Sequence, residues 1–290
     1  MYTMRPQAFE YHRPESLEQA LGLLTDVEDS RPLAGGHSLL PMMKLRLAAP
    51  AALVDLGRLP GLDEIARNGD SLTIGALATH ASIAASDVVR EACPVLAETA
   101  AIVGDRQVRN RGTIGGSLAH ADPSADYPTL MKALGATITA TGKGGERQIA
   151  ADDFFLDIFT TALQQGELVT SVSVPATAAG VGAIYLKHRH PASSYAVVGV
   201  AAAVGVNGSF SRARLVVGGA TARPVAVEAV SEMLVGQSPG EGAITAAADA
   251  VRDSLDSPIG DTYASGEYRV QLAVVMAKRA LTAAVERARG

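Results

Sequence analysis

The pattern of apolar and polar positions predicts a chain of many short helices and strands. Leucines recur at helical spacing after Ser16, so we expect a first helix to about Leu24 with Ser16 as its N-cap. The sequence RPLAGG then predicts a short strand that ends in glycines. The sequence SLLPMMKLRL predicts a helix capped by Ser38, with Pro41 in its first turn, where proline is tolerated.

The middle of the chain continues with strands, helices and a hairpin. AALVDLG and SLTIGAL predict buried strands, and Thr79 is placed to cap the next helix. Two helical segments separated at Pro94 follow, the second ending at Gly104, and Asp126 is placed to cap a helix that stops at Gly135. ATITATG and RQIA predict a hairpin across KGGE, and LVTSVSVP predicts a further strand.

The last third of the chain predicts a second sheet followed by helices. TAAGVGA, poor in large side chains, marks a domain boundary, which gives domains 1–176 and 177–290. Two apolar runs meet across Asn207-Gly208, a strong hairpin signal, and two helices are expected near 225–234 and over 266–289. Regular βαβ alternation is absent, so the fold class predicted is α+β with two sheets.

One uncharged stretch, residues 190–211, raises the question of a membrane span. Its apolar part, 195–206, is shorter than the roughly 20 residues that a bilayer requires, so we expect a soluble protein. The first fifteen residues lack the apolar core of a secretory signal peptide, which favours a cytoplasmic location.

Composition narrows the classes of function. A net charge of -5 gives no basic face for nucleic acid. Cys93 is the only cysteine, which excludes an internal disulfide, a thiolate zinc site and an iron–sulfur cluster held by this chain alone. Any redox role therefore requires a bound organic cofactor.

Two glycine pairs are the main candidates for holding such a cofactor. Gly35-Gly36 in LAGGHS and Gly115-Gly116 in TIGGSL each follow a short apolar segment and precede a polar residue. Glycine pairs allow positive φ and leave amide hydrogens unscreened, as a phosphate nest requires, and Gly36 also precedes a predicted helix start. Two such loops can clasp one pyrophosphate, although either pair can also be an ordinary tight turn.

Other chemistries have less support. His37, His120, Asp122 and Asp126 are residue types that bind zinc or iron, but nothing in the sequence shows that they converge, and Asp122-Pro123 is typical of a turn, so no metal is expected. The G-x-G-x-x-G fingerprint, the P-loop and the nucleophile elbow are all absent. No catalytic side chain is assigned.

Four stretches together resemble a known family: LAGGHSLLPMMKLRL, VRNRGTIGGSLAHADPSAD, GELVTSVSVP and ASGEYRVQLAVVMAKRAL. In order and spacing they are similar to the FAD-binding medium subunit of molybdenum hydroxylases, over essentially the whole chain. The resemblance implies a two-part FAD-binding domain of the vanillyl-alcohol-oxidase (PCMH) type and a smaller C-terminal α+β domain with an antiparallel sheet.

The resemblance also implies which residues contact FAD. The two glycine segments would hold the pyrophosphate, Asp126 and Lys187 match residues at the cofactor, Val103 and Val169 fall at apolar lining positions, and Tyr195 matches a position beside the flavin ring. Taken from the residues alone, Lys187 is explained equally well as a solvated charge at a strand end, and Tyr195 fits the core start of a strand. For Tyr195 we favour the position beside the flavin. The full set of expected cofactor-binding residues is Ala34, Gly35, Gly36, His37, Ser38, Val103, Thr113, Ile114, Gly115, Gly116, Ser117, Asp126, Val169, Lys187 and Tyr195.

The function implied by the resemblance is electron relay. Substrate would be oxidised on a large molybdopterin subunit, and electrons would pass through the 2Fe–2S clusters of a small iron–sulfur subunit to FAD in this chain and on to an external acceptor. A dimer of heterotrimers is the expected assembly. Two alternatives stay open: a self-contained FAD-dependent oxidoreductase, with Tyr195 or His120 as the acid or base, and a non-catalytic nucleotide-binding subunit.

Overall fold

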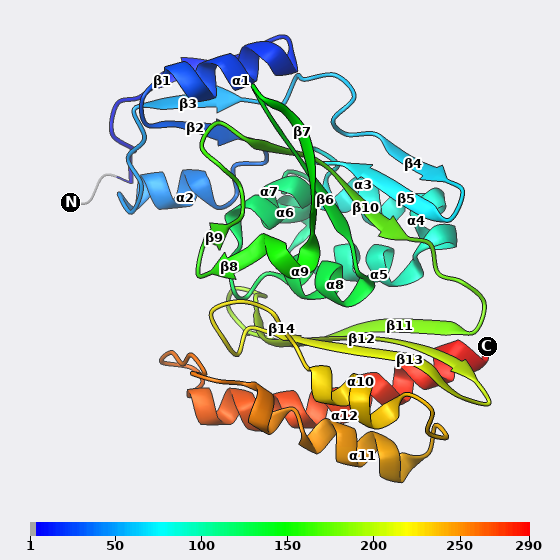
Figure 1. Cartoon of the computed structure of the whole chain (residues 1–290). Helices are drawn as coiled ribbons and strands as arrows, with labels where there is room; N and C mark the ends of the chain where they lie inside the picture. Colours follow the sequence, from blue (N-terminus) through cyan, green and yellow to red (C-terminus); the bar gives the residue numbers. More distant parts are fainter. Residues whose placement is uncertain (1–3) are drawn as a thin grey trace.

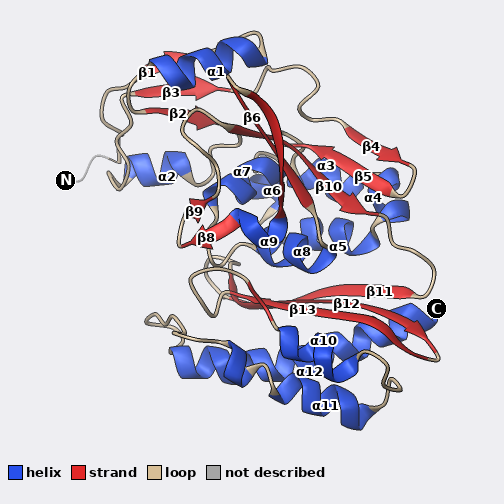
Figure 2. Cartoon of the chain, in the orientation of Figure 1, coloured by secondary structure: helices blue, strands red, loops and turns tan. Residues whose placement is uncertain are grey.

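The computed structural model describes residues 4–290, and its elements stack in successive layers (Figure 1). Residues 1–3, which begin the segment without a signal-peptide core, lie outside the described residues. Two sheets form one side, a group of short helices lies beneath them, and a third sheet backed by the C-terminal helices completes the chain (Figure 2).

The first layer is a three-stranded parallel sheet with one covering helix. Its strand order is β1-β3-β2, with β1 at Glu10–His12, β2 at Ser30–Leu33 and β3 at Ala52–Asp55. Helix α1 (Leu17–Asp26) packs Leu21 and Leu24 against Val54 in a small separate core. Ser16 caps α1 by accepting a hydrogen bond from the Gln19 amide, as predicted.

The second sheet has five antiparallel strands in the order β4-β5-β10-β6-β7. The predicted KGGE hairpin is present as the pair β6–β7. Helices between the sheets share the main core with residues of this sheet and of the third sheet. The bounds are β4 Ile65–Asn68, β5 Ser71–Gly75, β6 Thr137–Gly142, β7 Gly145–Ala150 and β10 Leu168–Pro175, with β8 Phe155–Asp157 and β9 Thr160–Thr161 as a separate short pair; the helices are α2 Leu39–Lys44, α3 His80–Ala85, α4 Asp87–Ala92, α5 Pro94–Ile102, α6 Arg106–Arg109, α7 Ile114–His120, α8 Asp126–Leu134 and α9 Ala151–Phe154.

The third sheet is buried on both faces. Strand β12 (Ala196–Asn207) lies between β11 (Val181–Arg189) and β13 (Ser209–Gly218), and β14 (Val225–Ala226) is at the edge. Along β12, Ala201 and Ala203 face the main core, while Val200 and Ala202 face the core made with the C-terminal helices. The apolar part of the uncharged stretch is therefore mainly a central strand, continuous in apolar residues because both of its faces are covered.

Among residues 4–290, no helix is both long and apolar enough to cross a membrane.

The C-terminal helices are α10 (Glu228–Leu234), α11 (Glu241–Asp249) and α12 (Gly266–Arg289), with a short 3-10 turn at Arg252–Ser254. The expectation of only two helices at this end was wrong, because α11 is alanine-rich and lacks a clear apolar stripe. Its Ile244 and Ala247 are buried in the core that α12 also lines.

One glycine of the third sheet allows helix α8 to lie directly on it, and another makes room within the sheet for a tyrosine ring. A side chain at Gly218 would place its Cβ 2.0 Å from the Thr129 Oγ1 of α8, and one at Gly199 would meet the Tyr185 hydroxyl at 2.3 Å. Strand glycines of this kind mark close approach of another element. Gly218 thus brings β13 against α8, and Gly199 leaves room on β12 for the Tyr185 ring of β11, whose hydroxyl donates to Asp126 at the start of α8.

Candidate cofactor site

A cavity of about 740 Å³ lies where the segment after β2, the start of α7, and the loops at 122–125 and 193–195 meet. Its volume is in the range of cofactor sites. Of the fifteen residues predicted from the sequence, thirteen line this cavity, and only Ile114 and Lys187 do not. Residues far apart in the sequence are thus brought to one place.

The first glycine segment has the form of an anion nest. Gly36 has φ +74°, and a Cβ at Gly35 would come within 2.2 Å of the Arg111 carbonyl oxygen. Within the described residues, the backbone N–H groups of Gly35, Gly36, His37 and Ser38 donate no hydrogen bond to protein. Consecutive free amides around a left-handed residue bind phosphate oxygens well. Ser38 occupies the N-cap position of α2, as predicted, but its backbone is already helical and its side chain accepts no capping bond.

The second glycine segment differs from the prediction. Gly115 and Gly116 form the first turn of helix α7, not a loop, and neither has positive φ. The Gly115 amide donates to the Ala76 carbonyl (2.9 Å) and the Gly116 amide to the Thr113 hydroxyl (3.1 Å), so these amides are not bare. The expectation of two equivalent phosphate loops was therefore wrong on this side.

What the second glycine pair provides is space. A Cβ at Gly115 would lie 2.4 Å from that of Ala76, so glycine lets α7 rest on the turn after β5. A Cβ at Gly116 would meet the Thr113 Oγ1 at 2.8 Å and point toward Ala34 of the first segment, 3.8 Å away. The absent side chain at Gly116 keeps open the gap between the two glycine segments.

Asp126 belongs to a buried ion pair at the edge of the cavity. Its carboxylate accepts from the Tyr185 hydroxyl (2.7 Å) and the Lys187 ammonium (2.9 Å), and the side chains of Lys187 and Asp126 are only 3% and 5% exposed. Burial raises the pKa of Asp126, while Lys187 and Tyr185 act in the opposite direction. The predicted capping role was wrong: Ala125 is the N-cap residue and Asp126 the first residue of α8. The reading of Lys187 as a solvated strand-end charge was also wrong.

Tyr195 lies on the cavity wall and not in the core. It precedes β12, is 43% exposed and lines the cavity, so the reading as the core start of a strand was wrong. Burial, followed by the Asp122 carboxylate, raises the pKa of the Tyr195 phenol, while the Ser38 hydroxyl of the first glycine segment lowers it. Val103 and Val169 also line the cavity; Val103 is partly buried and Val169 is buried.

His80 is a cavity-lining residue that the sequence reasoning missed. Its side chain is 4% exposed, its ring lies 5.3 Å from that of Tyr127, and its Nδ1 has no hydrogen-bond partner among the described residues. Burial, then the charges of His37 and Arg109, lowers the pKa of His80 from 6.5 to about 4. In the sequence His80 is only the residue after a helix cap, so no local signal marks it.

His120 and Asp122 also line the cavity, and both have structural contacts. The Asp122 carboxylate accepts from the Ser124 amide (2.8 Å), which confirms the predicted turn at Asp122-Pro123. The His120 ring lies 4.9 Å from that of Phe159, and burial lowers its pKa. Over residues 4–290, no group of three or more His, Cys, Asp or Glu side chains is arranged to hold a metal ion.

The fold and the cavity define a cofactor-binding α+β protein with an anion nest at the cavity wall. Comparison with protein families identifies the class more closely. Residues 7–177 match the family model described as "FAD binding domain in molybdopterin dehydrogenase", and residues 183–284 match "CO dehydrogenase flavoprotein C-terminal domain".

Individual relatives agree over the whole chain. The carbon monoxide dehydrogenase medium chain of Afipia carboxidovorans is 38% identical, with 99% of this chain and 100% of the relative covered. The 6-hydroxypseudooxynicotine dehydrogenase complex subunit alpha of Paenarthrobacter nicotinovorans is 37% identical, with 99% of this chain and 97% of the relative covered. The solved carbon monoxide dehydrogenase of Hydrogenophaga pseudoflava aligns with a TM-score of 0.94 at 39% identity, covering 97% of this chain and 99% of that one. The chain belongs to the family of FAD-binding subunits of molybdenum hydroxylases, and it is an oxidoreductase subunit.

Proposed function

We propose that this chain relays electrons from the iron–sulfur clusters of a small partner subunit, through FAD held in the 740 Å³ cavity, to an external acceptor. The observation that carries the proposal is the run of free amides at Gly35–Ser38 in the cavity wall, next to the gap that Gly116 keeps open. FAD bound there supplies the redox chemistry, which protein side chains alone do not.

The residues of the cavity fit such a group. The free amides of the first glycine segment would hold the pyrophosphate oxygens, and Thr113 and Ser117 would contribute hydroxyls from the second. Asp126, held in orientation by Tyr185 and Lys187, would present a fixed acceptor at the cavity edge, and Tyr195 a partly exposed ring. Lys187 would act through Asp126, since it does not line the cavity.

The partners follow from what this chain lacks. A 2Fe–2S cluster needs four thiolate or imidazole ligands, and the only cysteine, Cys93, is buried in the core. The clusters would therefore belong to the small subunit and the molybdopterin to the large one, in a dimer of heterotrimers. We place this complex in the cytoplasm, because a buried free thiol suits a reducing compartment. The substrate would be bound by the large subunit and does not constrain this sequence.

We also propose the boundary at 176/177 and the vanillyl-alcohol-oxidase (PCMH) type for the first domain. The ends of the two matching family models, residues 177 and 183, support the boundary. Beyond it, β11 begins a sheet that shares one core with the first domain and one with the C-terminal helices.

Purification of the tagged chain from its native cells tests the function. We expect a yellow complex with about one FAD per chain, together with a large molybdopterin subunit and a small iron–sulfur subunit. The substrate of the complex should bleach the flavin absorbance only when all three subunits are present. A colourless complex that takes up no FAD would exclude both flavin functions, and efficient turnover of a substrate by the isolated chain would favour a self-contained enzyme.

A second experiment tests the gap between the glycine segments. Gly116→Val places branched carbon atoms toward Ala34, and we expect FAD retention by the complex to be lost while the chain stays folded. Gly22→Val is the matched control, since Gly22 is also helical but a Cβ there has nothing within 4 Å. Equal FAD content in the two variants would show that the gap does not hold the cofactor.

A further inference from the structure

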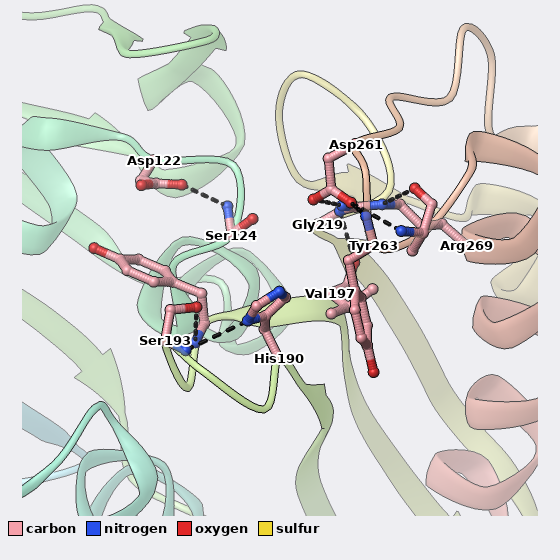
Figure 3. Close-up of polar contacts among 11 residues, drawn as sticks. Asp122, Ser124, His190, Ser193, Val197, Gly219, Asp261, Tyr263 and Arg269 are labelled. Atoms are coloured by element: carbon pink, nitrogen blue, oxygen red, sulfur yellow. Dashed lines mark hydrogen bonds and ion pairs between the residues drawn. The ribbon is translucent and has the colours of Figure 1, made fainter.

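A buried arginine of the C-terminal helix holds together the backbone behind the cavity wall. Arg269 of α12 is 4% exposed, and its guanidinium donates to the carbonyls of Val197 (3.0 Å) and Gly219 (2.6 Å). It also pairs with the Asp261 carboxylate (2.6 Å), as Figure 3 shows. One side chain thus joins the start of β12, the turn after β13 and the loop before α12.

The backbone that Arg269 holds is bonded directly to one wall of the cavity. Beside Val197, the Ala196 amide donates to the Ser124 carbonyl (3.1 Å), and the Gly219 amide donates to the Pro123 carbonyl (2.9 Å). Gly219 has φ +78°, and a Cβ there would lie 2.7 Å from the Val197 carbonyl oxygen, so only glycine permits these two segments to lie so close. The turn at 122–125, which leads into Asp126, is anchored through these two bonds.

The same network reaches the loop that carries Tyr195. His190 organises residues 190–195: its Nδ1 accepts from the Ala192 and Ser193 amides, and its own amide donates to the Tyr195 carbonyl (2.8 Å). Tyr263 packs edge-on against the His190 ring at 4.6 Å. Tyr263 follows Asp261, whose carboxylate accepts from its amide (2.8 Å) and pairs with Arg269.

We propose that Arg269, with Asp261 and Tyr263, is a positioning unit that fixes the 122–125 turn and the 190–195 loop, and so sets the affinity of the cavity for FAD. The inference rests on the proposed cofactor site. None of the three residues lines the cavity, so they act only through the two loops.

The chemistry of the network explains why arginine is needed. Its planar fork of donors reaches two carbonyls and a carboxylate at once, whereas the lysine ammonium is a single point on a flexible stem. Arg269→Lys keeps the charge that Asp261 requires but leaves at least one buried carbonyl without a donor. The loops would then lose their fixed attachment while the cores remain intact.

The test compares Arg269→Lys with Arg287→Lys on the same helix. Arg287 also joins α12 to other segments, donating to the Ala183 carbonyl and to Glu98, but it lies about 27 Å further along the helix. In the FAD-free chain we expect the amides of Ala196 and Gly219 to exchange hydrogen about tenfold faster in Arg269→Lys and at the wild-type rate in Arg287→Lys. Unchanged exchange at both amides in Arg269→Lys would overturn the inference.

Two variants of the exposed residue Tyr263 test the inference without changing a buried residue, so that a folding defect is not expected. Tyr263→Ala removes the ring from His190 and should speed exchange at Ala192 and Ser193, whereas Tyr263→Phe should not, since the Tyr263 hydroxyl makes no hydrogen bond within the described residues. In the complex, Arg269→Lys and Tyr263→Ala should each weaken FAD binding about tenfold. If the wild-type complex binds no FAD, the proposed function fails; if all variants bind FAD as tightly as the wild type, only this inference fails.

Discussion

Protonation of His80 should destabilise the folded chain in mildly acidic solution. His80 is 4% exposed, and burial lowers its pKa from 6.5 to about 4. Well above pH 6.5 the imidazole is neutral in both the folded and the unfolded chain, so it adds no pH dependence there. Below that pH the unfolded chain binds a proton that the folded chain does not, and the free energy of unfolding falls until the pH reaches about 4.

The size of this effect follows from the two pKa values. Between about pH 7.5 and about pH 5, the linkage relation gives a loss of about 2 kcal/mol from His80 alone. Urea unfolding of the FAD-free chain, followed by circular dichroism at both pH values, measures it. The cofactor must be absent, because ligand binding would add its own pH dependence.

The variant His80→Gln isolates the contribution of the imidazole. Glutamine does not titrate, so we expect the loss of stability on acidification to be smaller by about 2 kcal/mol than in the wild type. Tyr127→Phe is the matched control: it removes a buried hydroxyl that has no partner in the described chain but leaves the imidazole in place. The reasoning would be refuted if His80→Gln and the wild type lost equal stability between the two pH values.

Three further predictions concern stability and reactivity. Lys187→Met should lower the free energy of unfolding by about 3–5 kcal/mol, since it leaves the Asp126 carboxylate buried without its cation; a change below about 1 kcal/mol in urea titrations would contradict this. Gly115→Ala should cost about 1–3 kcal/mol, because its Cβ would lie 2.4 Å from that of Ala76; an unaltered melting temperature would argue against the close approach. Cys93 is fully buried and its pKa is raised to about 11, so a thiol reagent should label it only as fast as the chain unfolds, and rapid labelling of the native protein would disprove that protection.

Local signals in the sequence predicted local structure well. Ser16 and Thr79 both cap helices through their side chains, Gly135 ends α8 in the left-handed conformation, and the hairpin at Asn207-Gly208 is present. Each of these features depends on residues no more than a few positions apart. A short stretch of sequence therefore contains all the residues whose interaction forms the cap or turn.

The wrong predictions share a physical cause. Asp126 has the residue type of a helix cap, but Tyr185 and Lys187, about sixty positions later, take up both of its carboxylate oxygens. Gly115 and Gly116 have the composition of a phosphate loop, yet Ala76 and Thr113 accept from their amides. For Asp126 and Gly115, the partner that decides the role lies outside the motif. For Gly116, the Thr113 hydroxyl takes up the amide, and the motif alone does not exclude that bond.

By itself, the sequence determined the α+β class, the side-chain caps of α1 and α3, the need for an organic cofactor in any redox role and the resemblance to flavin-binding subunits. Only the tertiary structure decided that the free amides belong to the first glycine segment and that Gly116 provides space. It also decided that His80 lines the cavity and that Arg269 lies behind the cavity wall. Caps and turns form within one stretch of chain, whereas a cavity is made by segments whose contacts depend on how the sheets and helices pack.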